Sequence, residues 1–232
     1  DRCETEDCGD FFRVLRLTTR LAALTQETMI APAPYAAANE LAYIPPPIAQ
    51  VLQTGREIKS IEGEHRKVTI GFINVMGINE LLQTDGPDVL LSELQIYLSA
   101  VVELVDKHKG FLVSNDIDSN GFKLILVFGA PVSHEYDSAN ALRFALELNL
   151  KLTQLNLHLQ HRIGINNGFV FVGDVGSAYR REYWVMGDAV ILAARLMGAS
   201  SPGQICVSKR VSDEVGAAFR VRELPPLTLK GK

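Results

Sequence analysis

Three stretches of the chain place apolar residues on one face of a helix. Between residues 88 and 108, apolar side chains recur every three or four positions, at Leu91, Leu94, Leu98, Val101, Val102 and Val105. This spacing predicts an amphipathic helix over Asp88–His108, which ends before Gly110. Asp137–Leu155 is expected to form a second long amphipathic helix, and Asp188–Met197 is expected to form a third.

Short apolar runs between these helices predict strands. They are Lys67–Val75, Phe111–Asn115, Phe122–Phe128, Arg162–Asn166, Phe169–Val172, Gln204–Val207 and Phe219–Leu224. Hairpins are expected around Asp116–Gly121 and around Asn167-Gly168, and Ser208 is expected to cap a short helix. This order predicts an α+β fold that is ferredoxin-like, with a mostly antiparallel sheet and helices on one face.

Proline distinguishes the first part of the chain. Residues 31–34 are Ala-Pro-Ala-Pro and residues 43–47 are Tyr-Ile-Pro-Pro-Pro. Because proline fixes φ and lacks a backbone donor, these residues favour an extended connector. Asp10–Gln26 and Ile48–Leu52 are expected to be helices. We therefore expect an N-terminal extension or linker over residues 1–64 and a single domain over residues 65–232.

Composition and charge exclude several classes of protein. Lys and Arg number 23 against 27 Asp and Glu, for a net charge of −4, so the chain has no basic excess for nucleic acid or anionic membranes. No apolar run reaches the roughly 18 residues of a membrane span. The cysteines, Cys3, Cys8 and Cys206, cannot close a disulfide framework, which favours a reducing, cytoplasmic location.

Two short segments contain possible metal ligands, but neither has the set of ligands that a metal site needs. Asp116–Gly121 matches the first half of an EF-hand loop, but the twelfth position needs a bidentate Glu and is Val127. We therefore expect a polar hairpin tip there. His158 and His161 lie three residues apart, between a helix end and a strand start, where turn-capping or solvent roles are expected.

Three motifs together resemble class III nucleotidyl cyclase domains. The first runs from Tyr179 to Leu196 and contains the glycine turn at Gly187 and the Ala-Ala-Arg-Leu helix end; the second is Gly168–Ser177, and the third is the terminal Leu-Lys-Gly-Lys. The resemblance covers about Glu64–Lys232 and is greatest to the second of the two cyclase domains of tandem soluble adenylyl cyclases. It implies the class III cyclase fold.

The resemblance also implies a composite site between two domains packed head to tail. One domain supplies two aspartates that hold two Mg²⁺ or Mn²⁺ ions, which activate the attacking 3′-hydroxyl and neutralise the triphosphate of ATP or GTP. In this chain those aspartate positions fall on Asn74 and Phe122. A neutral carboxamide is a weak Mg²⁺ ligand and phenylalanine has no ligand atom, so both metal positions are expected to be degenerate.

The other domain of such a pair reads the base and contacts the phosphates. The base-reading positions fall on Ser114 and Trp184, and the phosphate-site Asn falls on Ile191, which cannot hydrogen bond. Arg195 matches the arginine that stabilises charge in the transition state. Tyr179 and Tyr183 are expected on an exposed arm that contacts the partner domain.

These positions imply a degenerate cyclase domain that is the non-catalytic or regulatory half of a dimer. Its partner would be another cyclase domain, in the same polypeptide or on another chain. No cofactor is expected for the isolated chain, and Mg²⁺ or Mn²⁺ is expected only at an intact composite site. Two alternatives remain: an active half paired with a metal-binding domain, in which Arg195 serves the composite site, or a pure interaction module that binds no nucleotide.

Overall fold

The computed structural model describes residues 3–7, 12–17, 63–118, 121–176 and 181–225, and the chain divides into two compact units, residues 1–46 and 47–232. In the first unit, β1 (Cys3–Asp7) pairs antiparallel with β2 (Phe12–Leu17). The prediction of a helix over Asp10–Gln26 is therefore wrong for the residues of β2, which form a strand. At the start of β2, apolar residues alternate with arginine, and this spacing of two residues is typical of a strand. The helix expected at Ile48–Leu52 lies outside the described residues.

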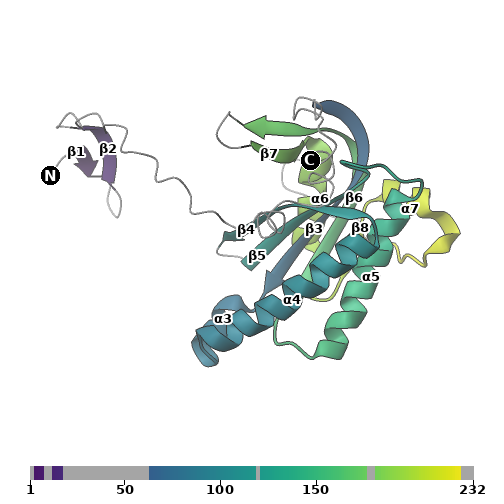
Figure 1. The fold of residues 1–232 in the computed structure, drawn as a ribbon, viewed down its shortest axis with the longest axis horizontal. Coiled ribbons are helices and arrows are strands. Elements are labelled where there is room, and N and C mark those ends of the chain that lie inside the picture. The colour runs from purple at the N-terminus through teal and green to yellow at the C-terminus, as the bar shows by residue number, and fades with distance from the viewer. Residues whose placement is uncertain (1–2, 8–11, 18–62, 119–120, 177–180, 226–232) are drawn as a thin grey trace, which may run out of the picture. The chain divides into compact units, whose positions relative to one another are not determined.

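A six-stranded sheet forms the centre of the second unit (Figure 1). Its strands are β3 (Glu64–Met76), β4 (Gly110–Asp118), β5 (Gly121–Phe128), β6 (Gln160–Gly176), β7 (Arg181–Met186) and β8 (Ile205–Val207). The order β4-β5-β3-β6-β7 is antiparallel throughout, and β8 pairs parallel with β6. The predicted mostly antiparallel α+β fold is confirmed.

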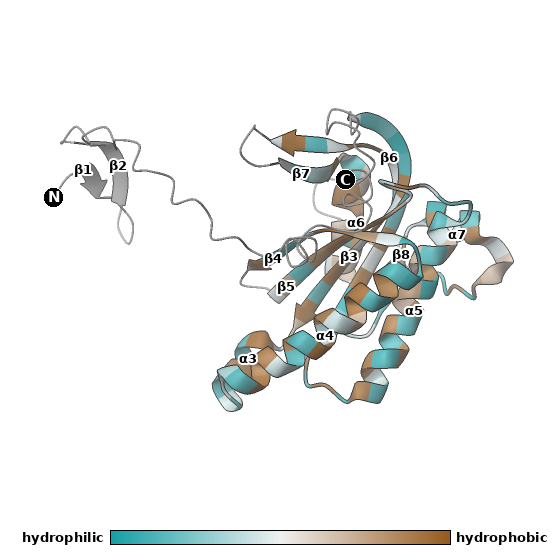
Figure 2. Ribbon diagram, viewed as in Figure 1, coloured by the Kyte–Doolittle hydropathy of each residue, from teal (hydrophilic) through white to brown (hydrophobic). Residues whose placement is uncertain are grey.

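The described helices of this unit include both long helices that the spacing predicted. They are α3 (Ile78–Thr84), α4 (Pro87–Lys107), α5 (Asp137–Leu155), α6 (Asp188–Ala199) and α7 (Lys209–Val215), followed by a 3₁₀ turn at Gly216–Ala218. Hydrophilic and hydrophobic residues alternate along α4 and α5 (Figure 2), as the amphipathic pattern requires. The helix α3 was not predicted, whereas the Ser208 cap is confirmed because its side chain accepts from the Val211 backbone N–H.

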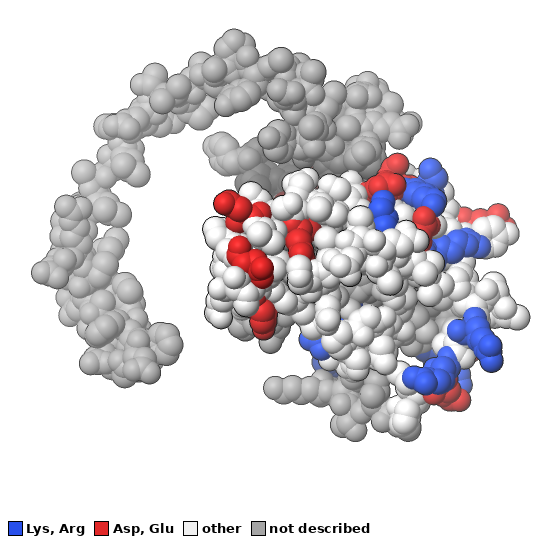
Figure 3. Space-filling view, turned by 90° about the horizontal axis from the view of Figure 1, so that it is seen from below, with Lys and Arg blue, Asp and Glu red and all other residues white. Residues whose placement is uncertain are grey.

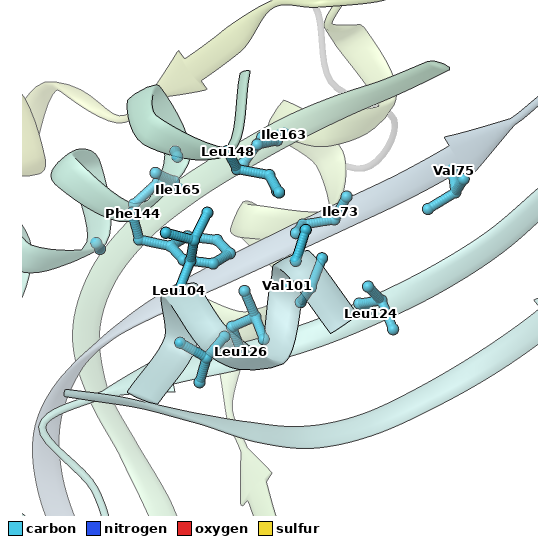
Figure 4. Close-up of a cluster of buried hydrophobic side chains, with 14 of the residues drawn as sticks. Ile73, Val75, Val101, Leu104, Leu124, Leu126, Phe144, Leu148, Ile163 and Ile165 are labelled. Carbon is cyan, nitrogen blue, oxygen red and sulfur yellow. The ribbon is translucent and has the colours of Figure 1, made fainter. Parts of the chain in front are cut away.

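Two hydrophobic clusters lie on opposite faces of the sheet. Successive strand residues point to opposite faces, so Ile73 and Val75 pack with α4 and α5 (Figure 4), whereas Ile70 and Phe72 pack with α6 and β7. The expectation that the helices share one face is therefore wrong. We call these the α4/α5 face and the α6 face.

Two strand predictions are also wrong. The hairpin predicted around Asn167-Gly168 is instead the middle of the continuous strand β6. Asn167 is buried there and donates from Nδ2 to Glu214 Oε2 at 2.7 Å, so tertiary contacts satisfy a residue that is typical of turns. Phe219–Leu224, predicted as a closing strand, has no strand structure.

A buried hydrogen-bonded network joins α4, α5 and β6. The Nε2–H of His161 donates to Asn149 Oδ1 at 2.5 Å, and Asn149 Nδ2 donates to the Gly203 carbonyl at 2.9 Å. This pairing fixes the tautomer of His161. Its Nδ1 therefore accepts the Tyr97 hydroxyl proton, at 3.0 Å. Both ring nitrogens are thus hydrogen-bonded with the imidazole neutral, and burial disfavours its charged form.

The stability of the fold should depend on the protonation of His161. Burial lowers the pKa of His161 from 6.5 to about 4. As the pH falls from about 6.5 to about 4, the unfolded chain binds a proton that the folded protein does not, so the free energy of unfolding should decrease. The loss should approach about 3 kcal/mol, at roughly 1.4 kcal/mol per pH unit. Urea unfolding at several pH values measures it; a His161→Gln variant with the same pH dependence would contradict this origin.

Gly164 sets the distance between β6 and α6. A Cβ at this position would lie 2.2 Å from the Met197 backbone N and 2.3 Å from the Ala193 carbonyl oxygen. Both atoms belong to the helix backbone and cannot move aside as a side chain does. The helix therefore packs directly on the strand at Gly164.

The close approach predicts opposite effects for two glycines. Gly164→Ala should lower the free energy of unfolding by about 3 kcal/mol, the upper range for overpacking. Gly198→Ala is the matched control, since a Cβ there meets no atom within 4 Å, and it should raise stability by about 0.5–1 kcal/mol through helix propensity. Chemical denaturation of the two variants measures both effects. Equal stabilities would mean that α6 does not pack on Gly164 as described.

Candidate functional site

Asn74 lies near the end of β3, between two cationic residues. It is fully buried, and it stands opposite Lys123 on β5 and Arg162 on β6. Opposed residues of antiparallel strands share a face. Because Phe72 belongs to the α6 face, these three side chains lie on that face too. The first predicted metal position is thus neutral and has a cation on each side.

Phe122 points to the other face of the sheet. Its register partner is Val75, and both side chains belong to the α4/α5 cluster. Phe122 is 7% exposed. The structure therefore does not bring the two predicted metal positions together.

These residues do not fit a pair of divalent metal ions. Mg²⁺ and Mn²⁺ prefer several anionic oxygen ligands in one place. Here the two positions offer one carboxamide oxygen and an aromatic ring on opposite faces, with Lys123 and Arg162 beside the carboxamide. Within residues 63–118, 121–176 and 181–225, no group of three His, Cys, Asp or Glu residues forms another metal site.

The two base-reading positions lie on different faces. A bulge between Leu112 and Ser114 shifts the β4 register, so that Ser114 stands opposite Ile125 on the α6 face. Trp184 lies on β7 and stands opposite Gly173 of β6. Its neighbours Tyr183 and Val185 both point into the cluster of the α6 face. Its indole therefore points the other way and is half-buried. Within one chain, Ser114 and Trp184 do not form a common base pocket.

Ile191 and Arg195 share the outward side of α6. Ala193 and Met197 face the sheet, so residues 191 and 195, one turn apart, point away from it. Ile191 is 50% exposed, and Arg195 is half-buried. Among the described residues, the Arg195 guanidinium has no hydrogen-bond or ion-pair partner. Its donors are therefore available to an anion or to a partner domain.

The arm tyrosine at position 183 is a core residue. Tyr183 is 9% exposed and its ring lies edge-on to Phe111, with 5.6 Å between ring centroids. Burial raises the pKa of Tyr183 to about 12, so the phenol stays neutral. Tyr179 lies outside the described residues. The exposed side of the arm is instead the opposite face of β6 and β7, where Trp184 is half-buried and Met186 is 44% exposed.

Arg162 was not among the residues that the sequence singled out. Its NH1 donates to the carbonyls of Gly198 at 3.1 Å and Ser200 at 3.4 Å, at the end of α6. One signal in the sequence could have indicated the side of the sheet on which Arg162 lies. Apolar residues alternate after His161, and this alternation places Arg162 on the face opposite Ile163. Only the register of β3 and β6, however, places Arg162 beside Asn74.

Figure 3 shows the charged side chains of the face seen from below. Acidic side chains gather on its left, and most basic ones lie on its right, where acidic side chains lie among them. This face has no single basic surface of the kind that binds nucleic acid. Of the helices in the described ranges, none has the length and apolar character needed to cross a bilayer.

Comparison with known proteins shows the family. The sequence model of the Adenylate and Guanylate cyclase catalytic domain matches residues 61–232. An uncharacterized protein of Mycobacterium tuberculosis is 31% identical over 72% of this chain, and Adenylate cyclase type 10 of Rattus norvegicus is 29% identical over 76%. The chain spans 30% and 11% of the lengths of these relatives.

A solved structure has the same fold. The adenylyl cyclase CyaB of P. aeruginosa aligns with a TM-score of 0.67 at 24% identity, over 74% of this chain and 91% of that one. The structural similarity agrees in fold with the sequence match over residues 61–232. The chain belongs to the adenylate and guanylate cyclase catalytic domain family.

The two aromatic residues of β7 should respond differently to truncation. Tyr183→Ala should lower the free energy of unfolding by about 3 kcal/mol, since it removes a buried ring. Trp184→Ala should cost less than about 1.5 kcal/mol, because its half-buried side chain lies outside both buried clusters. Urea unfolding of both variants measures this difference, and a larger loss for Trp184→Ala would contradict the assignment of faces.

Proposed function

We propose that this chain is a degenerate class III cyclase domain, which acts as the non-catalytic or regulatory half of a cyclase dimer in cyclic-nucleotide signalling. The observation that supports this most strongly is the state of the two metal positions. Asn74 and Phe122 offer no carboxylate and face opposite sides of the sheet. The isolated chain would hold no catalytic metal, and two Mg²⁺ or Mn²⁺ ions would belong to an intact composite site.

The partner in this proposal is another cyclase domain. One face of β6 and β7 presents Phe169 at 70% exposure, Met186 at 44% and Val175 at 40%, beside the half-buried Trp184. An apolar, aromatic surface of this kind supports docking of a second domain. The domain would act in the cytoplasm, as the sparse cysteines favour.

A second candidate is an active half paired with a metal-binding domain. Its support is Arg195, whose guanidinium points away from the sheet and has no partner within the described residues. Together with aspartates from the other domain, Arg195 could stabilise phosphate charge during conversion of ATP or GTP to a cyclic nucleotide and pyrophosphate. Ile191 and Trp184 count against it, since neither supplies the polar group that its position requires.

The purified chain should produce no cyclic nucleotide from ATP or GTP with Mg²⁺ or Mn²⁺. The double variant Asn74→Asp, Phe122→Asp should not restore activity, because its two carboxylates would still point to opposite faces. The Phe122→Asp change should also destabilise the fold by about 3–5 kcal/mol. A cyclase assay, with folding checked by circular dichroism, measures these outcomes. Turnover of about 1 s⁻¹ or more by either folded protein would refute the degenerate-domain proposal.

Mixing the chain with a cyclase domain that has both aspartates separates the candidates. A regulatory half should associate in sedimentation experiments and change the partner's activity without a requirement for Arg195. If the chain is an active half, Arg195→Ala should lower the turnover of the mixed pair about 10²–10³-fold, as expected when one preorganised hydrogen-bond donor is lost. A strict monomer that ignores the partner would count against both. Association with neither nucleotide binding nor an effect on turnover would indicate a pure interaction module.

A further inference from the structure

Residues 219–225, which follow α7 and the 3₁₀ turn (yellow in Figure 1), have the sequence pattern of a strand. Apolar and basic residues alternate over Phe219, Arg220, Val221 and Arg222. The φ and ψ of Phe219, −129° and 137°, are those of an extended chain. Within the described residues, however, no strand pairs with this segment.

The backbone of this segment offers hydrogen-bonding groups to a partner. Within the described part of the chain, no backbone N–H or carbonyl of residues 220–225 forms a hydrogen bond, and all six residues are exposed. A row of free N–H and C=O groups is a template for another extended chain. We propose that residues 219–225, which we call the docking segment, bind an extended acidic segment of a partner protein, which pairs with them as an added strand.

A cavity of about 790 Å³ lies along the docking segment. Its other walls come from α5, α6, β8 and α7, and most of its lining is apolar. Leu142, Leu196 and Cys206 are buried parts of this lining, whereas Leu146 and Val221 are exposed parts of it. In strand addition, main-chain hydrogen bonds provide affinity, and pockets receive alternate side chains of the incoming segment. The cavity would therefore receive apolar side chains from every second position of the partner.

The charges at the docking segment favour an acidic partner. Arg220 and Arg222 are exposed, and neither guanidinium has an ion-pair or hydrogen-bond partner among the described residues. Lys209 of α7 also lines the cavity, together with the carboxylates of Asp213 and Glu223. Three cations against two carboxylates leave one positive charge in excess. Because opposite charges attract across paired strands, carboxylates on the incoming strand would face the two arginines.

A second copy of this chain is a poorer occupant of the docking segment. If two docking segments paired antiparallel about Val221, Arg220 of each copy would stand opposite Arg222 of the other. Like charges directly opposite each other destabilise a strand pair. The alternation of arginines therefore acts against self-pairing and favours a partner of opposite charge.

Fluorescence anisotropy of a labelled synthetic peptide with the whole chain tests the proposal. The peptide alternates valine and glutamate, and we expect saturable binding below about 1 mM. A version with lysine in place of glutamate should bind more weakly, because its charges repel the arginines. Hydrogen exchange followed by mass spectrometry should show slower exchange of the amides of residues 220–224 when the glutamate peptide is bound.

Modified peptides test whether the contact is made by the backbone. Two versions of the glutamate peptide, N-methylated at the valines or at the glutamates, each lack the donors of one edge of the peptide. The version that lacks the pairing edge should bind about tenfold more weakly or worse, because several main-chain hydrogen bonds are lost.

Charge reversal in the chain tests the contribution of the arginines. Arg222→Glu should weaken binding of the glutamate peptide about fivefold, since an exposed attraction becomes a repulsion, and it should strengthen binding of the lysine peptide. Arg143→Glu is the matched control, because Arg143 is exposed on α5 and does not line the cavity, and it should leave both affinities unchanged.

Four results would each overturn the inference. They are no saturable binding of the glutamate peptide in that range, equal binding by the methylated and unmethylated peptides, equal effects of Arg222→Glu and Arg143→Glu, and protection of residues 220–224 that rises with protein concentration alone. The last result would identify a second copy of this chain as the occupant.

Discussion

The backbone contact between α6 and Gly164 positions most of the α6 face. A side chain at residue 164 would collide with the Ala193 carbonyl and the Met197 amide, so the helix lies as close to β6 as two backbones allow. Hydrogen bonds secure both ends of the helix. Asn166 Nδ2 donates to the Ala189 carbonyl at 2.9 Å, and Arg162 donates to the Gly198 carbonyl at 3.1 Å. With its inner side fixed in this way, α6 directs Ile191 and Arg195 outward.

The same strand, β6, connects the two faces of the molecule. Its successive residues alternate between the α4/α5 core and the α6 face, so Ile163 packs in one cluster while Arg162 reaches the end of α6. Asn167 then joins β6 to α7 through Glu214. A polar residue in mid-strand is costly unless it is hydrogen-bonded, and these contacts satisfy it. Positions that would otherwise interrupt the strand therefore stabilise the packing of helices on both sides.

The alternation of strand residues is the reason why we expect two substitutions not to rebuild the predicted metal positions. Asn74 and Phe122 occupy adjacent registers of one strand pair, and adjacent registers point to opposite faces. Phe122 is part of the core beneath α4, where a carboxylate would be buried without a partner. The two positions thus hold a core residue and an amide, with Lys123 and Arg162 beside the amide. This arrangement is the main support for the proposal of a non-catalytic or regulatory half.

The sequence alone determined the family, the long helices and the residue types at each expected site position. Those properties depend on local periodicity and on motif residues that are close together in the chain, such as the helical spacing of residues 137–155 and the glycine turn before α6. The tertiary structure decided the features that depend on pairing between distant strands. Register placed Arg162 beside Asn74 and put Phe122 on the other face, and long-range hydrogen bonds kept Asn167 in a continuous strand instead of a turn. Local sequence does not encode which strand lies beside which, so these relations appear only once the sheet is formed.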